Sequence, residues 1–294
     1  ELPDQPLTFE INDENLEIFI HFQNGKYNFI GQKGDTYPQQ KPLNDNAISI
    51  SMDAQMLLNG ISRSLFATAD DELRPVMNGV YFDIHTDDLT FVASDGHKLV
   101  RLRNLAVKSP ERASFILPKK PANLLKNLLA KESEQVLIKF DDNNAYITCT
   151  NFEMVCRLIE GRYPNYNSVI PQENPFKVTI DRISFLNALK RVSVFSNPAS
   201  SLVKLHLKDS LITVSAQDID FSTSAEERIV CQFDGTELSI GFKATYLIEI
   251  LGNISSEEVV LELADPSRAG LIVPSENDED EDLLMLLMPM MLND

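Results

Sequence analysis

The sequence predicts an α+β fold made of duplicated domains, because segments recur along it and because apolar patterns of two kinds alternate. Three segments occur twice at separations of about 125 positions, which exceeds the ~20–50-residue period of solenoids and fits whole domains. The recurring pairs are Tyr37-Pro38 and Tyr163-Pro164, Ile50–Asp53 and Thr179–Asp181, and Lys120–Phe140 and Lys243–Leu263. Each full copy places two helical patterns among strand-like segments, which is typical of helices laid on antiparallel sheets.

The recurrence divides the chain into three parts. Residues 1–45 form the C-terminal remnant of a first domain, residues 46–172 a second domain and residues 173–294 a third domain. The first part contains only closing strands, within residues 8–31. Taking the repeat period as the domain size, about 80 residues are missing from its front. Since the chain also begins without Met, we expect it to be N-terminally truncated.

The elements of the second domain follow from alternation, helical periodicity and turn residues. Extended segments and strands are expected over 46–52, 76–85, 88–94, 98–103, 113–117, 135–140, 144–150 and 154–160. Helices are expected over 54–66 and 119–131, each directly after an extended segment. The turn signal Asp141-Asp142-Asn143-Asn144 separates two of the closing strands.

The third domain repeats this order. Its extended segments and strands are expected over 176–180, 202–208, 210–216, 221–229, 236–240, 258–263, 268–273 and 284–290. Its helices are expected over 182–193 and 243–252. The turn signal Lys208-Asp209-Ser210 separates the first two long strands.

Composition excludes some classes of protein. No apolar run approaches the ~18 residues of a membrane span, and the N-terminus lacks the basic and apolar regions of a secretory signal. The chain has three cysteines, Cys149, Cys156 and Cys231, whose spacing matches no zinc site. We expect buried free thiols in a cytoplasmic protein, with no metal and no cofactor.

The charges are distributed unevenly between helices and the rest of the chain. The net charge is −18, yet the four predicted helices hold nine basic residues and one acid, Glu249. If the helices share one side, that side is positive, and its attraction for phosphate is independent of sequence. The absence of interleaved aromatic residues favours duplex DNA over single strands. The alternative is that these lysines and arginines are merely solvated.

The segment Ser94-Asp95-Gly96-His97-Lys98-Leu99 follows a predicted strand. Asp95 and His97 could serve acid–base chemistry in an enzyme, but no nucleophile motif accompanies them. Asp-Gly is typical of a tight turn between strands, because Gly tolerates a positive φ. We therefore favour a turn that frames a binding pocket and expect no catalytic residues.

Two unusual runs end the chain. The acidic run Glu276–Asp282 lacks calcium-loop spacing and is expected to be a solvated hairpin loop. The run Leu283–Leu292 is apolar on both faces, and Pro289 should leave the sheet. Its Met and Leu side chains suit an adaptable apolar groove for peptides, with a core strand and frayed tail as the alternative.

Taken together, SDGHKL, GRYPNY followed by VIP, and the terminal LLMPMML resemble the bacterial DNA polymerase III beta subunit family, the beta sliding clamps. The resemblance covers essentially the whole chain. It implies a DNA-clamp fold in which two three-domain protomers close head-to-tail into a ring, with helices lining a central hole around duplex DNA. Such a homodimer is a non-catalytic processivity factor in DNA replication. Its partners are the replicative polymerase catalytic subunit, the clamp loader and other proteins with a clamp-binding motif.

The resemblance also implies three sets of site residues. The peptide-binding cleft between the second and third domains would hold Met77, Ser94, Gly96, His97, Lys98, Leu99, Pro164, Val169, Leu286, Met288, Pro289, Met290, Met291 and Leu292. The DNA-facing residues, taken from the charge pattern, would be Arg63, Lys119, Lys120, Lys126, Arg182, Lys190, Arg191 and Lys243. The dimer interface would pair Tyr27 and Phe29 with Val194 and Phe195.

The sequence departs from the family pattern at three places. Lys98 stands where Arg is usual, Ser94 replaces Thr, and Asn293-Asp294 extend a terminus that commonly stops at Leu. These departures bear on which peptide is preferred rather than on where it binds. A non-ring peptide-binding adaptor is the alternative to the clamp.

Overall fold

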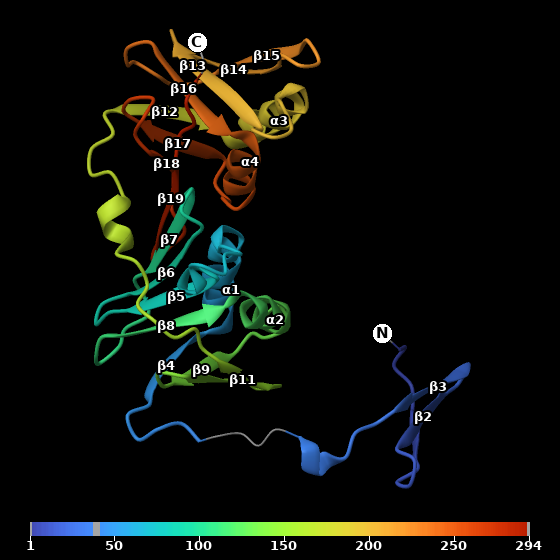
Figure 1. Ribbon diagram of the computed structural model, residues 1–294. Helices are drawn as coiled ribbons and strands as arrows, with labels where there is room; N and C mark the ends of the chain where they lie inside the picture. The colour runs from blue at the N-terminus through green and yellow to red at the C-terminus, as the bar shows by residue number, and fades with distance from the viewer. Residues whose placement is uncertain (1, 38–41, 293–294) are drawn as a thin grey trace. The chain divides into compact units, whose positions relative to one another are not determined.

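The computed structural model describes residues 2–37 and 42–292 and divides the chain into two compact units, Glu1–Pro42 and Leu43–Asp294 (Figure 1). The expected division at residue 45 lies close to this boundary. The expected division at residue 172 lies inside the second unit, where one sheet runs through both halves. Pro38 of the first recurring pair and the Asn293-Asp294 extension lie outside the described residues.

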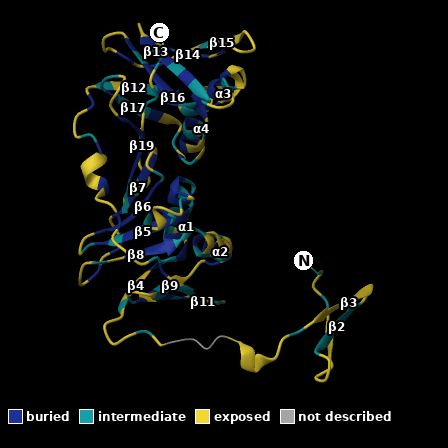
Figure 2. Ribbon diagram, in the orientation of Figure 1, coloured by how far each residue is buried: buried dark blue, intermediate teal, exposed yellow. Residues whose placement is uncertain are grey.

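The first unit is a small antiparallel sheet. Its strands are β1 (Thr8–Ile11), β2 (Glu17–Phe22) and β3 (Gly25–Ile30), as expected within residues 8–31, and a short 3-10 turn, η1, follows over Gly34–Thr36. The register places Phe9, Ile18, Ile20, Tyr27 and Phe29 on one face of this sheet, where Ile20 lies between Phe9 and Tyr27. No described residue of this unit is buried (Figure 2).

The second unit contains all the predicted helices and strands of both full domains. In the first half these are β4 (Ile48–Asp53), α1 (Ala54–Ser64), β5 (Gly79–Ile84), β6 (Leu89–Ser94), β7 (Lys98–Asn104), β8 (Ala113–Pro118), α2 (Lys119–Leu129), β9 (Gln135–Phe140), β10 (Asn144–Thr148) and β11 (Glu153–Arg157). In the second half these are β12 (Phe176–Asp181), α3 (Arg182–Val192), β13 (Leu202–Lys208), β14 (Leu211–Asp218), β15 (Thr223–Val230), β16 (Leu238–Lys243), α4 (Ala244–Gly252), β17 (Glu258–Leu263), β18 (Gly270–Pro274) and β19 (Glu281–Leu287). This is the α+β fold that the sequence predicts.

The two halves begin in the same way because the recurring aspartates cap their first helices. Asp53 accepts hydrogen bonds from the backbone N–H groups of Gln55 and Met56 at the start of α1. Asp181 accepts one from Ser184 at the start of α3. Such caps satisfy backbone donors that have no partner inside the helix.

Three antiparallel sheets build the second unit. Four-stranded sheets, β11-β10-β9-β4 and β15-β14-β13-β16, belong to the first and second halves respectively. An eight-stranded sheet, β12-β17-β18-β19-β7-β6-β5-β8, crosses from one half to the other through the β7–β19 pair. All four helices lie on the same side of this sheet (Figure 1).

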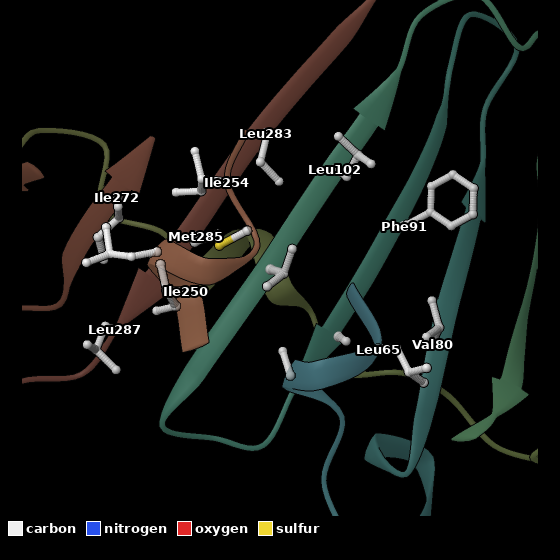
Figure 3. Close-up of a cluster of buried hydrophobic side chains, with 14 of the residues drawn as sticks. Leu65, Val80, Phe91, Leu102, Ile250, Ile254, Ile272, Leu283, Met285 and Leu287 are labelled. Atoms are coloured by element: carbon white, nitrogen blue, oxygen red, sulfur yellow. The ribbon is translucent and has the colours of Figure 1, made fainter. Parts of the chain in front are cut away.

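Alternation along β7 and β19 sends successive side chains to opposite faces of the eight-stranded sheet. Leu102, Leu283, Met285 and Leu287 join the helix-side core, which continues from one half into the other without interruption (Figure 3). Leu99, Leu284 and Leu286 join a second apolar cluster on the face away from the helices. We call these the helix face and the outer face.

Several predicted boundaries were wrong by a few residues. The helix expected over 54–66 ends at Ser64 and continues as a 3-10 turn, η2, over Leu65–Ala67, and the last strand is Glu281–Leu287 rather than 284–290. The strand starts earlier because Glu281 and Asp282 pair with Asn104 and Arg103 of β7. The run Glu276–Asp282 is therefore only partly a loop, and three of its carboxylates, Asp278, Glu281 and Asp282, form ion pairs with arginines.

Replacing Met285 by Ala should lower the free energy of unfolding of the second unit by about 2–5 kcal/mol, because it removes a side chain from a closed core and leaves a cavity. Met285 is fully buried between the halves. The matched control is Met291→Ala, at a side chain that is 80% exposed, where we expect a change within about 0.5 kcal/mol. Urea titration followed by circular dichroism measures both, and equal effects would contradict the assigned core.

Candidate peptide groove and basic helix side

The Ser94–Leu99 segment forms the tight turn of the β6–β7 hairpin. The backbone N–H groups of His97 and Lys98 donate to Asp95 Oδ1 at 2.8 and 2.9 Å. Ser94 Oγ accepts from the Gly96 N–H at 3.1 Å and donates to the Lys98 carbonyl at 2.9 Å. Gly96 has φ +91°, a conformation that favours glycine. These bonds and the positive φ account for Ser94, Asp95 and Gly96 through structure alone.

Asp95 is poorly suited to acid–base catalysis. Burial opposes its ionisation, but the backbone N–H groups of Lys98 and His97 and the Lys98 ammonium outweigh this and lower the pKa of Asp95. A carboxylate with a lowered pKa and filled hydrogen-bond sites is a weak general base at neutral pH. Within residues 2–37 and 42–292, no group of three or more His, Cys, Asp or Glu side chains is arranged to hold a metal ion.

The last strand ends at Leu287, so Pro289 lies outside the eight-stranded sheet as predicted, but the C-terminal segment is not frayed over its described length. In β19, Leu286 lies opposite Leu99. Beyond the strand, the Met288 N–H donates to the His97 carbonyl and the Met290 N–H donates to the Gly241 carbonyl, both at 2.8 Å. The segment therefore runs from the hairpin turn to β16.

An apolar cluster lies on the outer face beside this segment. Its buried members are Val92, Leu99, Ile116, Tyr163, Tyr166, Ile170, Ala269, Leu271, Leu284 and Leu286. The Tyr163 ring stacks on Tyr81 with centroids 4.6 Å apart, and the Tyr166 hydroxyl donates to Asp83 at 2.8 Å. The connection between the two halves of the unit thus packs over the sheet, and Pro164 and Val169 on it are exposed.

The predicted cleft residues divide by exposure. Gly96, His97, Pro164, Val169, Met288 and Met291 are exposed and available to a ligand; Pro289, Met290 and Leu292 are half-buried; Met77, Ser94, Lys98, Leu99 and Leu286 are buried. Leu292 lies apart from the outer-face cluster, because it packs close to Gly241 and lines a hollow with Leu202 and Ala216. We call the candidate peptide-binding surface formed by the 94–99 turn, Pro164, Val169 and residues 286–291 the groove.

Lys98 does not point into the outer-face cluster. It shares the helix face with Val100, and its ammonium lies 3.0 Å from both Asp95 and Glu249 and 4.1 Å from the centre of the Tyr246 ring. Arg74 also reaches the turn and donates to the Asp95 carbonyl at 3.3 Å. The sequence analysis did not assign Arg74, Tyr246 or Glu249 to this site. Glu249 carried a signal, because it is the one acid in the predicted helices.

The predicted DNA-facing residues fall into three groups. Within the described residues, Lys120, Lys126 and Lys190 have no carboxylate within 4.0 Å, whereas Arg63, Lys119 and Arg191 are ion-paired. Arg182 donates to the carbonyls of Ser256 and Leu251, and the Lys243 ammonium lies 4.7 Å from the centre of the Tyr246 ring.

Arg63 is bound most completely. Its side chain is 15% exposed and contacts Asp278 and, at 2.9 Å, Glu281, so α1 of one half is joined to the acidic run of the other. A guanidinium enclosed by two carboxylates is not available to phosphate, and Arg63 is therefore not retained among the DNA-facing residues.

The four predicted interface residues are all exposed, two of them on the first unit and two on the second. Tyr27 and Phe29 lie on the apolar face of the first unit, and Val194 is 78% exposed in the 3-10 turn η5 (Ser193–Phe195) that follows α3.

No helix among the described residues is long and apolar enough to cross a bilayer.

Comparison with known proteins gives one consistent result. Residues 51–165 match the sequence profile described as the DNA polymerase III beta subunit, central domain, and residues 167–291 match the profile for its C-terminal domain. The beta sliding clamp of Pseudomonas aeruginosa is 29% identical over 247 residues, which are 84% of this chain and 66% of that protein. The Staphylococcus aureus protein of the same name is 27% identical over 287 residues, which are 97% and 75%.

Solved structures agree with the sequence matches. The DNA polymerase sliding clamp of Pseudomonas aeruginosa superposes with a TM-score of 0.88 at 26% identity, over 98% of this chain and 78% of that one. A Pseudomonas aeruginosa beta subunit bound to griselimycin gives a TM-score of 0.89 at 26% identity, over 99% and 78%. The present chain thus spans 66% to 75% of the length of these curated relatives. Because the two profiles together cover most of the sequence, the chain belongs to the DNA polymerase III beta subunit family, the beta sliding clamps.

Proposed function

We propose that this protein is a DNA sliding clamp, a ring-forming processivity factor that encircles duplex DNA and tethers replication proteins through the groove. The observation that carries this proposal is the continuous eight-stranded sheet with all four helices of the unit on one side. Because one sheet is shared by the two domains, it holds the helices of both domains on one surface. The groove lies where the two domains meet, at the β7–β19 pair. DNA contact and protein contact can then be made by different parts of one rigid unit.

The helix side supports contact with DNA. Lys120 and Lys190 are exposed on α2 and α3, and together with Lys126 they provide positive charge without a carboxylate partner among the described residues. The chain as a whole is strongly acidic, so phosphate is attracted to this side and repelled elsewhere. Such binding depends on charge and not on base sequence.

The groove supports contact with a short peptide. Apolar anchors of a partner would lie against Val169, Pro164 and Met288, which are exposed above the outer-face cluster. Clustered apolar contacts at the centre of a small interface supply most of the binding free energy. Partners in this proposal are the replicative polymerase, the clamp loader and other proteins that carry a clamp-binding motif.

Ring closure requires head-to-tail association, for which both units offer free sheet edges. β3 is an edge strand of the first unit, and β15 is an edge strand of the second. The exposed apolar residues Tyr27, Phe29, Val194 and Phe195 are the proposed contacts of this interface. Edge strands with neighbouring apolar side chains are templates for pairing with another chain.

The ring hypothesis is tested by retention on DNA circles. The chain, extended at its front to the length of its relatives, is loaded onto nicked circular duplex DNA, and its solution mass is measured in parallel. A clamp stays on the circle during gel filtration and is lost when the circle is linearised. Equal retention on both forms would favour a peptide-binding adaptor whose helices are merely solvated.

The double substitution Lys120→Glu with Lys190→Glu should weaken binding to duplex DNA and flatten its salt dependence. Each lost phosphate contact should change the slope of log K against log salt by about 0.9. The matched control is Lys108→Glu with Lys139→Glu, which alters two exposed lysines outside the helices that likewise have no carboxylate within 4.0 Å among the described residues. Fluorescence anisotropy with a labelled duplex measures both, and an equal loss in the control would refute a DNA-facing helix side.

The substitution Val169→Glu should weaken binding of a labelled peptide that carries Gln and a Leu-Phe pair by at least tenfold, or about 1.4 kcal/mol. Val169 is 57% exposed in the groove, and a carboxylate there would lose water without gaining a partner. Val230→Glu, at a 77% exposed position on edge strand β15, is the control and should bind normally. Unchanged binding by the Val169 variant would place the peptide elsewhere.

A further inference from the structure

We infer that Asp83 and Tyr166 position one wall of the groove, because their hydrogen bond fixes the connector between the two halves to the outer face of the sheet. The connector, residues 159–170, carries Pro164 and Val169, which are the exposed residues of that wall. The inference rests on the proposed peptide-binding function. It adds two residues that act through the connector backbone rather than by contact with the peptide.

Two buried tyrosines attach the connector to strand β5. The Tyr163 ring lies nearly parallel to the Tyr81 ring, with centroids 4.6 Å apart and an interplanar angle of 2°. The Tyr166 hydroxyl donates to Asp83 Oδ2 at 2.8 Å. Stacked rings tolerate an offset, whereas a hydrogen bond fixes the two atoms that it joins. The Tyr166 contact therefore sets the place of the connector along β5.

The exposed residues of the wall lie directly beside these contacts. Pro164 stands between the two tyrosines in the sequence, and Val169 ends the 3-10 turn η4 (Tyr166–Val169) that Tyr166 begins. Ser168 closes the turn, because its N–H and its hydroxyl donate to the Asn165 carbonyl at 3.2 and 2.7 Å. Since the turn is short and internally bonded, a shift of Tyr166 would carry Val169 with it.

The chemistry of the two side chains keeps their hydrogen bond formed. Asp83 Oδ2 also lies 3.2 Å from His85 Nε2, so a second side chain holds the carboxylate in place. Burial and the hydrogen bond to Asp83 raise the pKa of Tyr166, so the hydroxyl keeps its proton and remains a donor at neutral pH. A hydrogen bond to a carboxylate is shorter and stronger than one between two neutral groups.

The second half of the unit contains the same strand arrangement without this contact. Strands β15-β14-β13-β16 are paired in the same order as β7-β6-β5-β8. The outer-face positions beneath the connector are changed in the second half, where Lys204, His206, Ser215 and Gly241 stand at the register positions of Tyr81, Asp83, Val92 and Ile116.

Two backbone hydrogen bonds support this equivalence. The Ile159 N–H donates to the Ile116 carbonyl at 3.1 Å in the first half. The Met290 N–H donates to the Gly241 carbonyl at 2.8 Å in the second half. Each donor lies just beyond the last strand of its half.

The changed positions leave this face of the second half open. Lys204 and Ser215 line a hollow of about 580 Å³ at the place where the connector packs in the first half. The same four strands are thus paired without an aromatic ring or a carboxylate at these positions. The presence of Tyr81 and Asp83 in the first half is therefore explained by the connector and not by the sheet.

The test is a double-mutant cycle on Asp83→Ala and Tyr166→Phe, read out as affinity for the labelled peptide that carries Gln and a Leu-Phe pair. We expect each single variant to bind about three- to tenfold more weakly. The double variant should bind no more weakly than the poorer single one, because both changes remove the same hydrogen bond. Asp83→Asn keeps an acceptor oxygen for the Tyr166 hydroxyl and should bind within about twofold of the unmodified protein.

The matched control is Thr90→Val, which removes another buried hydroxyl–carboxylate bond from the same face of the sheet. Thr90 lies opposite Asp83 in the register and donates to Asp88 at 2.9 Å, so the control leaves the connector contact in place. We expect its peptide affinity to be unchanged even where its melting temperature falls as far as that of Tyr166→Phe. An equal loss of affinity in the control would mean that general disorder of the sheet face weakens binding, and would overturn the inference.

Amide hydrogen exchange supplies a measurement that does not depend on the peptide. Tyr166→Phe should speed exchange of the Ser168 N–H at least about fivefold relative to Thr90→Val, because the turn loses its attachment to the sheet. Unchanged exchange, or additive losses of affinity in the cycle, would overturn the inference, and so would normal binding by both single variants. Failure of the unmodified protein to bind the peptide would instead count against the proposed function.

Discussion

The pairing of β7 with β19 is the constraint on which the rest of the second unit depends. Seven consecutive residues of each strand are in register, from Glu281 opposite Asn104 to Leu287 opposite Lys98. This ladder joins strands from two different domains into one sheet, so the apolar cores on either side of the junction become continuous. A shift of one residue would exchange the helix-face and outer-face side chains, and the two apolar clusters would then be lost together.

The ion pairs across the junction add geometric definition to this ladder. Arg63, Arg101 and Lys98 of one half contact carboxylates of the other half, namely Glu281, Asp282 and Glu249. Pairs that are partly withdrawn from water contribute little net stability, but they penalise arrangements in which one partner is left alone. The junction therefore combines a backbone ladder that sets register with charged contacts that disfavour sliding or opening.

Local rules predicted the elements of this protein well, whereas the partners of its charged side chains could not be read from sequence. Asp53 and Asp181 recur before helices and cap them, and Pro289 lies just beyond the last strand, because these effects depend on a few neighbouring residues. Whether Arg63 is free or ion-paired depends instead on residues more than 200 positions away in the sequence. Charge counting recognised the excess of basic residues on the helices correctly but could not separate free lysines such as Lys120 from bound cations. For the same reason the sequence could not show that the Lys98 ammonium pairs with Glu249 of the other half.

The three-stranded sheet of the first unit has a thermodynamic consequence of its own. Its face of Phe9, Ile18, Ile20, Tyr27 and Phe29 carries apolar area that a sheet of this size normally hides, and none of its described residues is buried. Covering that face would remove apolar area from water and so stabilise the sheet. Its folding is thus linked by mass action to whatever covers it, and its melting temperature should rise with the concentration of the covering element.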